Sequence, residues 1–156
     1  MNIVIASDPS AFQLKEAVRR HLEHKGHTVS DRGTSATQKV PFYEAAQNAC
    51  SVLQEGKAER GILLCGSGMG MAIVAGKQAG VIAACVESVY AARMSRAINN
   101  ANVLCLGAMI WGETMAQEAV DVFLTTAHTQ GLETIKEDLV KSAEEVTRID
   151  QRTRKK

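Results

Sequence analysis

The stretch that most constrains the fold is RGILLCGSGMGM, residues 60–71. A short apolar run, typical of a buried strand, delivers Cys65 to a turn with glycines at positions 66, 68 and 70. An Ala/Val-rich segment typical of a helix follows, to about Lys77. A thiol at a strand end, beside the backbone N–H groups of a glycine turn and a helix N-terminus, suits anionic chemistry. The stretch therefore predicts a strand, a ligand-binding loop and a helix in succession.

Four further strand-like segments alternate with helix-length segments, and most are continuous rather than alternating in hydrophobicity. This pattern favours a parallel sheet with helices on both faces, a doubly wound α/β domain. Ligands bind such sheets at the carboxyl ends of the strands, so we expect Asp8, Cys65, Glu87 and Gly107 to line one crevice. The predicted strands are residues 2–6, 28–31, 61–65, 81–86 and 103–106, and the predicted helices are residues 11–25, 41–54, the segment after the glycine loop to 77, 88–98 and 114–125.

Length and composition limit the class of protein. The chain has 156 residues, 46% of them hydrophobic and 22% charged, which is ordinary for one globular domain with a sizeable core. The formal net charge of +1 argues against dominant electrostatic binding to nucleic acid or to a membrane. No apolar run reaches transmembrane length, and a strand-like run begins at Asn2 where a signal peptide would lie. We therefore expect a cytoplasmic protein.

The four cysteines form no CxxC pair, and no histidine lies at zinc-finger spacing from them, so we expect no metal site. Cys85 and Cys105 lie in strand-like apolar runs, for which we expect buried, unreactive thiols. Only Cys65 is followed by a polar glycine turn. The four histidines fall at positions typical of the surface, so no Ser-His-Asp arrangement is indicated.

The glycine loop matches neither of two common nucleotide-binding motifs, so we expect no cofactor. A dinucleotide motif follows the first strand, where this chain has no glycine, and Met71 stands where GxGxxG requires its third glycine. A Walker loop is excluded because no Gly-Lys-Ser/Thr follows. A helix N-terminus stabilises a nearby anion by about 0.3–1 kcal/mol, whereas removing one oriented oxyanion donor costs about 2.7–4 kcal/mol. The loop is therefore of most use in stabilising an oxyanion, and a base beside it suits proton abstraction next to a carbonyl.

Several separated motifs, in one order, make the chain resemble the ribose-5-phosphate isomerase B and galactose-6-phosphate isomerase family over about residues 2–124. The resemblance implies a Rossmann-like αβα sandwich and an active site at a dimer interface. It also implies aldose–ketose isomerisation through a cis-enediolate, without a metal. The motifs are Ser7-Asp8, Phe12-x-Leu-Lys15, Gly26-His-x-Val-x-Asp31-x-Gly33-Thr34, Gly61-Ile-Leu-x-Cys65-Gly-Ser-Gly-x-Gly70, Lys77, Tyr90-x-Ala-x-Met-Ser-Arg96 and Asn99-x-Ala-Asn-Val-Leu-x-Leu-Gly107.

The resemblance implies roles for single residues. Cys65 corresponds to the base that moves a proton between carbons 1 and 2, and Ser67 to the residue that assists proton exchange on the enediolate oxygens. Asp8 and Asn99 correspond to residues that contact sugar hydroxyls, although both also suit helix caps, and Lys136 also suits a solvated lysine. The expected substrate-binding residues are Asp8, Gly66, Gly68, Met69, Gly70, Asn99 and Lys136.

The chain departs from the family around the ring and the phosphate of the substrate. Ile98 stands where the family has the histidine that opens a furanose ring, and isoleucine cannot transfer protons. Basic residues of the phosphate side correspond to Pro9, Met109 and Leu132. We therefore expect an open-chain substrate such as a tetrulose 4-phosphate, with Lys39, Lys136 or a basic group of another subunit at the phosphate.

The C-terminal segment, residues 132–156, has a pattern of its own after the isomerase domain of residues 1–131. Its apolar residues form one narrow stripe, which fits packing on its own domain or on another subunit. We expect a homodimer or a dimer of dimers that binds a small sugar phosphate, and a solvated basic tail at 152–156. The stripe comprises Leu132, Ile135, Leu139, Val146 and Ile149.

Two other functions stay open. The missing histidine and basic residues fit a partner-dependent or non-catalytic subunit of a heteromeric isomerase, whereas the retained Cys65 loop fits an enzyme. A small-molecule sensor, in contrast, would be stabilised by its ligand without any proton exchange.

Overall fold

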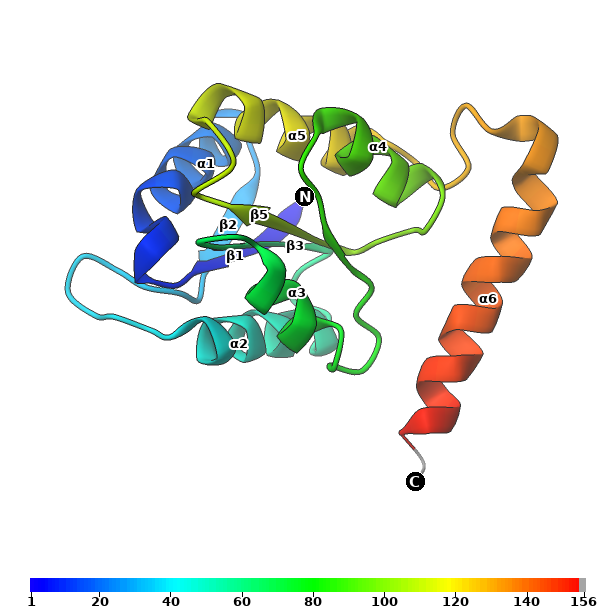
Figure 1. Cartoon of the computed structure of the whole chain (residues 1–156), viewed down its shortest axis with the longest axis horizontal. Helices are drawn as coiled ribbons and strands as arrows, with labels where there is room; N and C mark the ends of the chain where they lie inside the picture. The colour runs from blue at the N-terminus through cyan, green and yellow to red at the C-terminus, as the bar shows by residue number, and fades with distance from the viewer. Residues whose placement is uncertain (155–156) are drawn as a thin grey trace.

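The structure, a computed structural model, describes residues 1–154 and forms a five-stranded sheet with helices on both faces (Figure 1). The strands are β1 (Asn2–Ser7), β2 (Thr28–Asp31), β3 (Arg60–Cys65), β4 (Ala83–Cys85) and β5 (Val103–Gly107). The helices are α1 (Phe12–His24), α2 (Phe42–Gln54), α3 (Met69–Ala75), α4 (Val89–Ala97), α5 (Glu113–Thr125) and α6 (Lys136–Thr153), with 3-10 turns at Pro9–Ala11 and Glu133–Ile135. Every predicted strand and helix is present.

All five strands run parallel, in the order β2-β1-β3-β5-β4. Ser7 pairs with Leu64 and Cys65 pairs with Gly107, so the carboxyl ends of β1, β3 and β5 finish side by side. Since α1 to α4 each return the chain to the start of another parallel strand, they begin near the carboxyl edge and end near the amino edge. Helix α5 follows β5 and so also begins near the carboxyl edge. The predicted doubly wound α/β fold, a Rossmann-like αβα sandwich, is confirmed.

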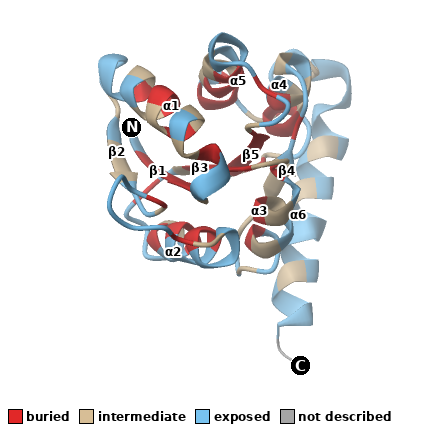
Figure 2. Cartoon of the chain, turned by 60° about the vertical axis from the view of Figure 1, so that its left-hand side comes forward, coloured by how far each residue is buried: buried red, intermediate tan, exposed pale blue. Residues whose placement is uncertain are grey.

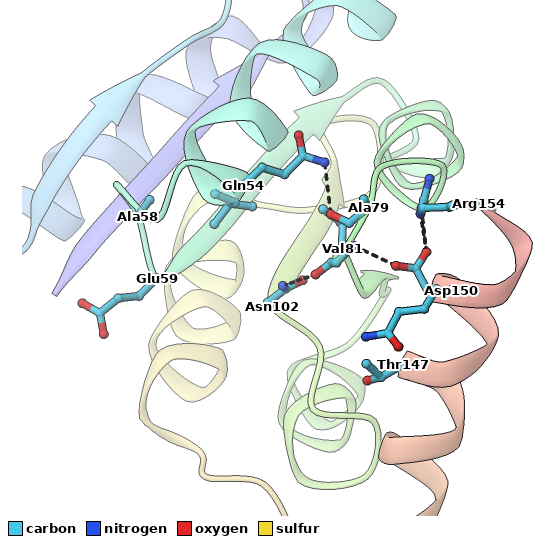
Figure 3. A pocket seen from close by; sticks show the side chains of 12 residues that line it. Gln54, Ala58, Glu59, Ala79, Val81, Asn102, Thr147, Asp150 and Arg154 are labelled. Atoms are coloured by element: carbon cyan, nitrogen blue, oxygen red, sulfur yellow. Dashed lines mark hydrogen bonds and ion pairs between the residues drawn. The ribbon is translucent and has the colours of Figure 1, made fainter.

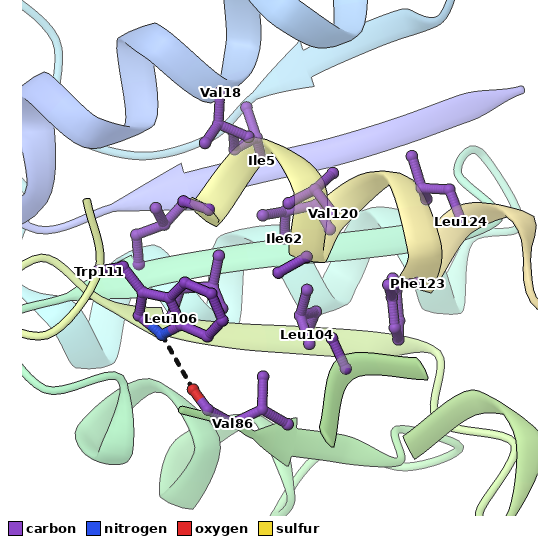
Figure 4. Packing of buried hydrophobic residues seen from close by; sticks show 14 of the residues in the cluster. Ile5, Val18, Ile62, Val86, Leu104, Leu106, Trp111, Val120, Phe123 and Leu124 are labelled. Atoms are coloured by element: carbon purple, nitrogen blue, oxygen red, sulfur yellow. Dashed lines mark hydrogen bonds between the residues drawn. The ribbon is translucent and has the colours of Figure 1, made fainter. Parts of the chain in front are cut away.

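Each face of the sheet has its own hydrophobic core, because the strands carry apolar side chains on both sides. Helices α1, α4 and α5 cover one face, where Ile62 and Leu104 of the sheet meet Phe123 of α5 (Figure 4). Under the carboxyl edge, the indole N–H of Trp111 donates to the carbonyl of Val86 at 3.0 Å (Figure 4). This bond ties the segment after β5 to the end of β4. Helices α2 and α3 cover the other face.

A buried cation ties α1 to the segment after β2. Lys15 is fully buried, and its Nζ forms an ion pair with Asp31 and donates to the carbonyl of Thr34 at 2.6 Å. The N–H of Thr34 in turn donates to the carbonyl of Ser7 at 2.8 Å. These contacts fix the segment after β2 against the last residue of β1.

Helix α6 stands apart from the sandwich (Figure 1, Figure 2). No residue of α6, 136–153, is buried, and Ile149 of the predicted stripe is 43% exposed, so the stripe stays open to solvent in the single chain. The C-terminal end of the helix is anchored by polar contacts: Asp150 accepts from the N–H of Gly80 at 3.0 Å, and Arg154 donates to the carbonyl of Lys77 at 2.8 Å. Neither α6 nor any other helix within residues 1–154 combines the length and apolarity that a membrane span requires.

Two expectations from the sequence are wrong. Cys85, expected as a buried thiol, is exposed, because β4 is shorter than the apolar run and ends at Cys85 itself, on an edge strand. Arg154, expected in a solvated tail, belongs to the anchor of α6, because Asp150 lies one helical turn before it and pairs with it at 2.7 Å. Lys155 and Lys156 lie outside the described residues.

Candidate active site

Three of the predicted site residues meet at the carboxyl edge of the sheet. Asp8 follows β1, Cys65 ends β3 and Gly107 ends β5, and the N–H of Asp8 donates to the carbonyl of Leu64 at 3.2 Å. Since β3 lies between β1 and β5, Cys65 is at the centre of this edge. Asp8 lies on one side of it, and the segment after β5 lies on the other.

Cys65 is held by the loop that follows it. The residue is 5% exposed, and its Sγ accepts a hydrogen bond from the N–H of Gly68 at 3.2 Å. An N–H directed at the sulfur stabilises negative charge there. The thiol is thus shielded from bulk water and already has one backbone donor beside it.

Two glycines allow the loop to lie directly on the sheet. A Cβ on Gly107 would lie 2.6 Å from the carbonyl carbon of Ser67, and a Cβ on Gly68 would lie 2.9 Å from that of Leu106. Gly68 also has a φ of +79°, in the left-handed region that favours glycine. Close backbone packing therefore requires glycine at both positions.

Asp8 caps the turn that follows β1. Its Oδ1 accepts from the N–H groups of Ser10 and Ala11 at 3.0 and 3.3 Å, and from the hydroxyl of Ser10 at 2.6 Å. Within residues 1–154, Oδ2 receives no hydrogen bond, so it can accept one from a ligand hydroxyl. The cap and the predicted ligand contact are compatible, because they use different oxygens.

The other predicted loop residues follow Cys65 along the glycine loop. The Oγ of Ser67 accepts from the N–H of Met69, whose side chain is half exposed. The N–H of Met109 donates to the carbonyl of Gly66 at 2.9 Å, and its side chain lies over that glycine, 3.1 Å from the position of a Cβ. A Cβ on Gly70 would lie 3.0 Å from the aromatic ring of Phe42, the first residue of α2.

The structure does not bring Ile98, Asn99 or Lys136 to Cys65 within one chain. Ile98 and Asn99 follow α4 and are exposed at the amino edge, where they line a groove of about 600 Å³ together with residues of α6. Lys136 is exposed at the start of α6. Asn99 and Cys65 of one chain thus lie at opposite edges of the sheet.

The sequence reasoning missed Cys85. Its Sγ donates to the carbonyl of Ser67 at 3.8 Å and lies 3.1 Å from the position that a Cβ on Gly68 would take. Its position in the sequence could have indicated this contact, because Cys85 lies near the end of an apolar run and the carboxyl ends of parallel strands meet at one edge of the sheet. In the core, by contrast, burial raises the pKa of the Cys50 thiol to about 11 and that of Cys105 well above its ordinary value.

The four histidines lie away from this edge. His21 and His24 are in the last turns of α1, His27 precedes β2, and His128 follows α5, all toward the amino edge. His21 pairs with Asp121 at 2.8 Å. Among residues 1–154, Cys65 therefore has no histidine beside it to exchange its proton.

A groove of about 660 Å³ also lies at the amino edge, between the end of α6 and the turn before β4 (Figure 3). The side-chain amide of Gln54 donates to the carbonyl of Ala79 at 3.0 Å, and that of Asn102 donates to the carbonyl of Gly80 at 2.8 Å. Because Asp150 also bonds to Gly80, the polar lining of the groove is engaged in holding α6. The groove is separate from the Cys65 site.

The carboxyl edge thus combines a buried strand-end thiol with a backbone donor, in a doubly wound α/β sheet, as the motifs of the sequence predicted. The family model of ribose/galactose isomerases matches residues 3–140. The chain is 47% identical to 4-deoxy-4-sulfo-D-erythrose isomerase of Clostridium sp. (strain MSTE9), over 93% of this chain and 92% of that one. It is 39% identical to D-erythrulose-4-phosphate isomerase of Pectobacterium atrosepticum, over 80% and 82% of the two chains.

Solved structures agree with these relatives. The ribose-5-phosphate isomerase B of Clostridium thermocellum superimposes with a TM-score of 0.89 at 31% identity, over 98% of this chain and 99% of that one. The chain belongs to the ribose/galactose isomerase family, as its motifs predicted. It is an aldose–ketose isomerase of the sugar-phosphate isomerase family, of the ribose-5-phosphate isomerase B type.

Proposed function

We propose that this isomerase acts on a four-carbon, open-chain sugar with a terminal anion, and that Cys65 is its base. The observation that carries the assignment of the base is the hydrogen bond from the N–H of Gly68 to the Cys65 sulfur at the carboxyl edge. A sulfur that is buried, supported by a backbone donor and flanked by Asp8 has the surroundings that a carbon-acid base requires.

The reaction needs one proton to move between two carbons. The Cys65 thiolate removes the proton from carbon 2 of the aldose, and the C–H electron pair forms the carbon–carbon double bond while the carbonyl electrons move onto oxygen. N–H groups of residues 66–70 stabilise the enediolate oxygens, and Ser67 exchanges a proton with them. The Cys65 thiol then returns its proton to carbon 1, which gives the ketose. Asp8 holds a substrate hydroxyl through Oδ2.

The choice of a four-carbon substrate rests on positions where this chain has uncharged residues and the resembled family has histidine or arginine. Ile98 cannot open a ring, and neither a tetrulose 4-phosphate nor a 4-deoxy-4-sulfotetrose can close a furanose ring, since carbon 4 carries no free hydroxyl in either. Two relatives are named for substrates of these two kinds. A sulfonate carries one negative charge where a phosphate ester carries nearly two. The uncharged residues Pro9, Met109 and Leu132 therefore favour the sulfonate as the better substrate of the two.

A second copy of the chain completes the proposed site. Asn99 and Lys136 lie away from Cys65 of their own chain, and the apolar stripe of α6 is exposed. Packing of the α6 stripe on another copy would bury it and would bring these side chains to the neighbouring Cys65. We therefore propose a homodimer, or a dimer of dimers, in which Asn99 contacts a substrate hydroxyl and Lys136 binds the terminal anion.

Deuterium exchange from solvent into carbon 1 or 2 tests the proposal. Erythrulose 4-phosphate, 4-deoxy-4-sulfoerythrose and ribose 5-phosphate are compared side by side, and we expect the two four-carbon compounds to exchange faster. Equal or faster turnover of ribose 5-phosphate would contradict the open-chain substrate. Cys65→Ala should abolish exchange, and full activity of that variant would rule out the assigned base.

The same assay separates the proposal from a partner-dependent subunit. An enzyme exchanges deuterium when it is purified alone, whereas a subunit stays inert until its partner is added. Ligand-induced stabilisation without exchange, for any of the three compounds, would indicate a sensor instead.

A further inference from the structure

One peptide group of the glycine loop lies between two cysteine sulfurs. The N–H of the Ser67–Gly68 peptide donates to the Sγ of Cys65 at 3.2 Å. The carbonyl oxygen of the same peptide accepts from the Sγ of Cys85 at 3.8 Å. In a trans peptide the N–H and C=O bonds point in opposite directions, so the two sulfurs lie on opposite sides of one planar group.

The orientation of this peptide decides what Cys65 faces. If the peptide turned over, the carbonyl oxygen would face the Cys65 sulfur and would repel negative charge there, where the N–H now stabilises it. Gly68, at a φ of +79°, gives little protection against such a turn, because glycine occupies positive and negative φ about equally well. Packing of the loop against Gly107 opposes this turn, and a hydrogen bond on the carbonyl side adds to it in keeping the N–H on Cys65.

Cys85 provides this contact. It comes from the end of β4, two strands away from β3, and its sulfur lies 3.1 Å from the position of a Cβ on Gly68. The residue is exposed, but partial desolvation of its sulfur raises the pKa of the thiol, with Cys65 and Glu87 acting in the same direction. Cys85 therefore keeps its S–H at neutral pH and remains a donor.

We propose that Cys85 is a positioning residue of this isomerase: its thiol holds the Ser67–Gly68 peptide with the N–H directed at Cys65. The proposal rests on the proposed role of Cys65 as base. An S–H to carbonyl hydrogen bond is weak. The bond acts by orienting the Ser67–Gly68 peptide, so that its N–H and not its carbonyl oxygen is directed at the base. Cys85 does not touch the reacting carbons.

Three substitutions separate donation from packing. Cys85→Val keeps a side chain of similar size but has no hydrogen-bond donor, and Cys85→Ala removes both the donor and most of the side-chain volume. Cys85→Ser keeps a donor, the hydroxyl, although the C–O bond is shorter than the C–S bond. We expect kcat to fall about tenfold in the Val and Ala variants, because the Cys65 thiolate would lose its hydrogen bond from the N–H of Gly68. About tenfold is the size expected for the loss of one hydrogen bond to a charged group. The Ser variant should keep more activity than either. KM should change less than kcat, because the defect lies at the base.

A measurement that needs no substrate accompanies the kinetics. The rate at which iodoacetamide alkylates Cys65 is followed against pH, with the modified peptide resolved by mass spectrometry so that Cys85 does not interfere. In Cys85→Val and Cys85→Ala we expect the midpoint of this profile to move to higher pH. Cys50→Ala, which removes a core thiol from α2, is the matched control and should leave the midpoint in place.

Two outcomes would overturn the proposal. One is an alkylation midpoint equal to that of the wild type in both Cys85→Val and Cys85→Ala. The other is a kcat equal to that of the wild type in Cys85→Val, because packing of the side chain without a donor would then be sufficient. The test is independent of the proposed function, since the alkylation profile reports the surroundings of Cys65 even if another group proves to be the base.

Discussion

Gly107 is the residue on which the position of the loop depends most directly. Because a Cβ there would lie 2.6 Å from the carbonyl carbon of Ser67, Gly107→Ala must displace the loop or the end of β5. A displacement of about 1 Å at a reacting group can cost about 10²-fold in rate. We therefore expect kcat to fall about 10²-fold, measured by deuterium exchange, with a stability loss of about 1–3 kcal/mol from overpacking.

Gly112→Ala is the matched control for this prediction. Gly112 lies in the same segment after β5, has a φ of −76°, and has nothing within 4 Å of the position of its Cβ. Activity should therefore stay within about twofold of the wild type, at a stability cost of about 0.5–1 kcal/mol, because alanine is a poorer N-cap of α5 than glycine. A Gly107→Ala enzyme with normal kcat would show that the loop does not depend on its seat against β5.

Lys15 is the residue whose loss should most destabilise the fold without touching the site chemistry. Lys15→Met leaves Asp31 without its buried cation and Thr34 without a donor. Breaking a buried ion pair costs about 3–5 kcal/mol, and we expect the lower end, about 3 kcal/mol, because Asp31 is partly solvated. Urea unfolding measures this loss.

The matched surface variant is Lys25→Met, which breaks an exposed pair with Asp121 at 3.3 Å. This pair should contribute about 0–1 kcal/mol. Similar midpoints for the two variants would mean that the buried lysine adds no more than a surface one.

At the scale of elements, the end of α6 depends on the charge of Asp150. The guanidinium of Arg154, together with the N–H of Gly80, lowers the pKa of the Asp150 carboxyl from its ordinary value. A carboxyl with a lowered folded-state pKa stabilises the anchor fully above its unfolded pKa of about 3.9, and the contribution is lost as pH falls through the folded value. The anchor should therefore hold at neutral pH and fail in acid.

Hydrogen exchange of the α6 peptide, compared between the wild type and Asp150→Asn at the same pH, tests this. We expect faster exchange in the variant at pH 5 to 7, and a difference that fades below about pH 4. Asp138→Asn, in the first turn of α6, should leave the C-terminal half of the helix unchanged. A difference that persists unchanged into acid would exclude the Asp150 charge as its cause.

The elements themselves could be predicted because their signals are local. The strand 61–65 is visible in the sequence as a short apolar run, and Ser88 caps α4 as its residue type and place indicate, accepting from the N–H of Ala91. The end of β4 was not predictable in this way. The apolar run continues past Cys85, but the strand stops there because it pairs only with β5 on one side. The sequence therefore predicts a core thiol at Cys85, where the structure has an exposed one.

At the scale of the whole molecule, the site is expected to be shared between copies. Val146→Glu places a charge in the exposed stripe of α6, where Val146 is 48% exposed. If this face packs on a second copy, the charge should dissociate the dimer, as sedimentation at several concentrations would detect. Because Asn99 and Lys136 would then be lost from the neighbouring site, kcat/KM should fall together with the dimer fraction.

Lys141→Glu, on the other side of α6, controls for a change of charge on the helix. It should remain dimeric and active. If Val146→Glu were monomeric and fully active, each chain would carry a complete site, and the proposed sharing of Asn99 and Lys136 would be wrong.

How residues from different parts of the chain meet was only partly predictable. The rule that ligands bind at carboxyl strand ends correctly grouped Asp8, Cys65 and Gly107, because it depends only on parallel strands. It could not place Asn99, which lies at the other edge because α4 carries the chain back across the sheet. The strand order also depends on pairing between distant segments, which no local pattern in the sequence encodes.

The hydrogen bond from Gly68 to the Cys65 sulfur also provides an intrinsic spectroscopic probe of the charge on that sulfur. The amide proton of Gly68 touches the atom whose charge changes during the proposed reaction, so its nuclear magnetic resonance frequency should follow the ionisation of that one sulfur. A label on Gly68 would then give a spectroscopic titration of the base in the intact protein, free of signals from the core thiols Cys50 and Cys105.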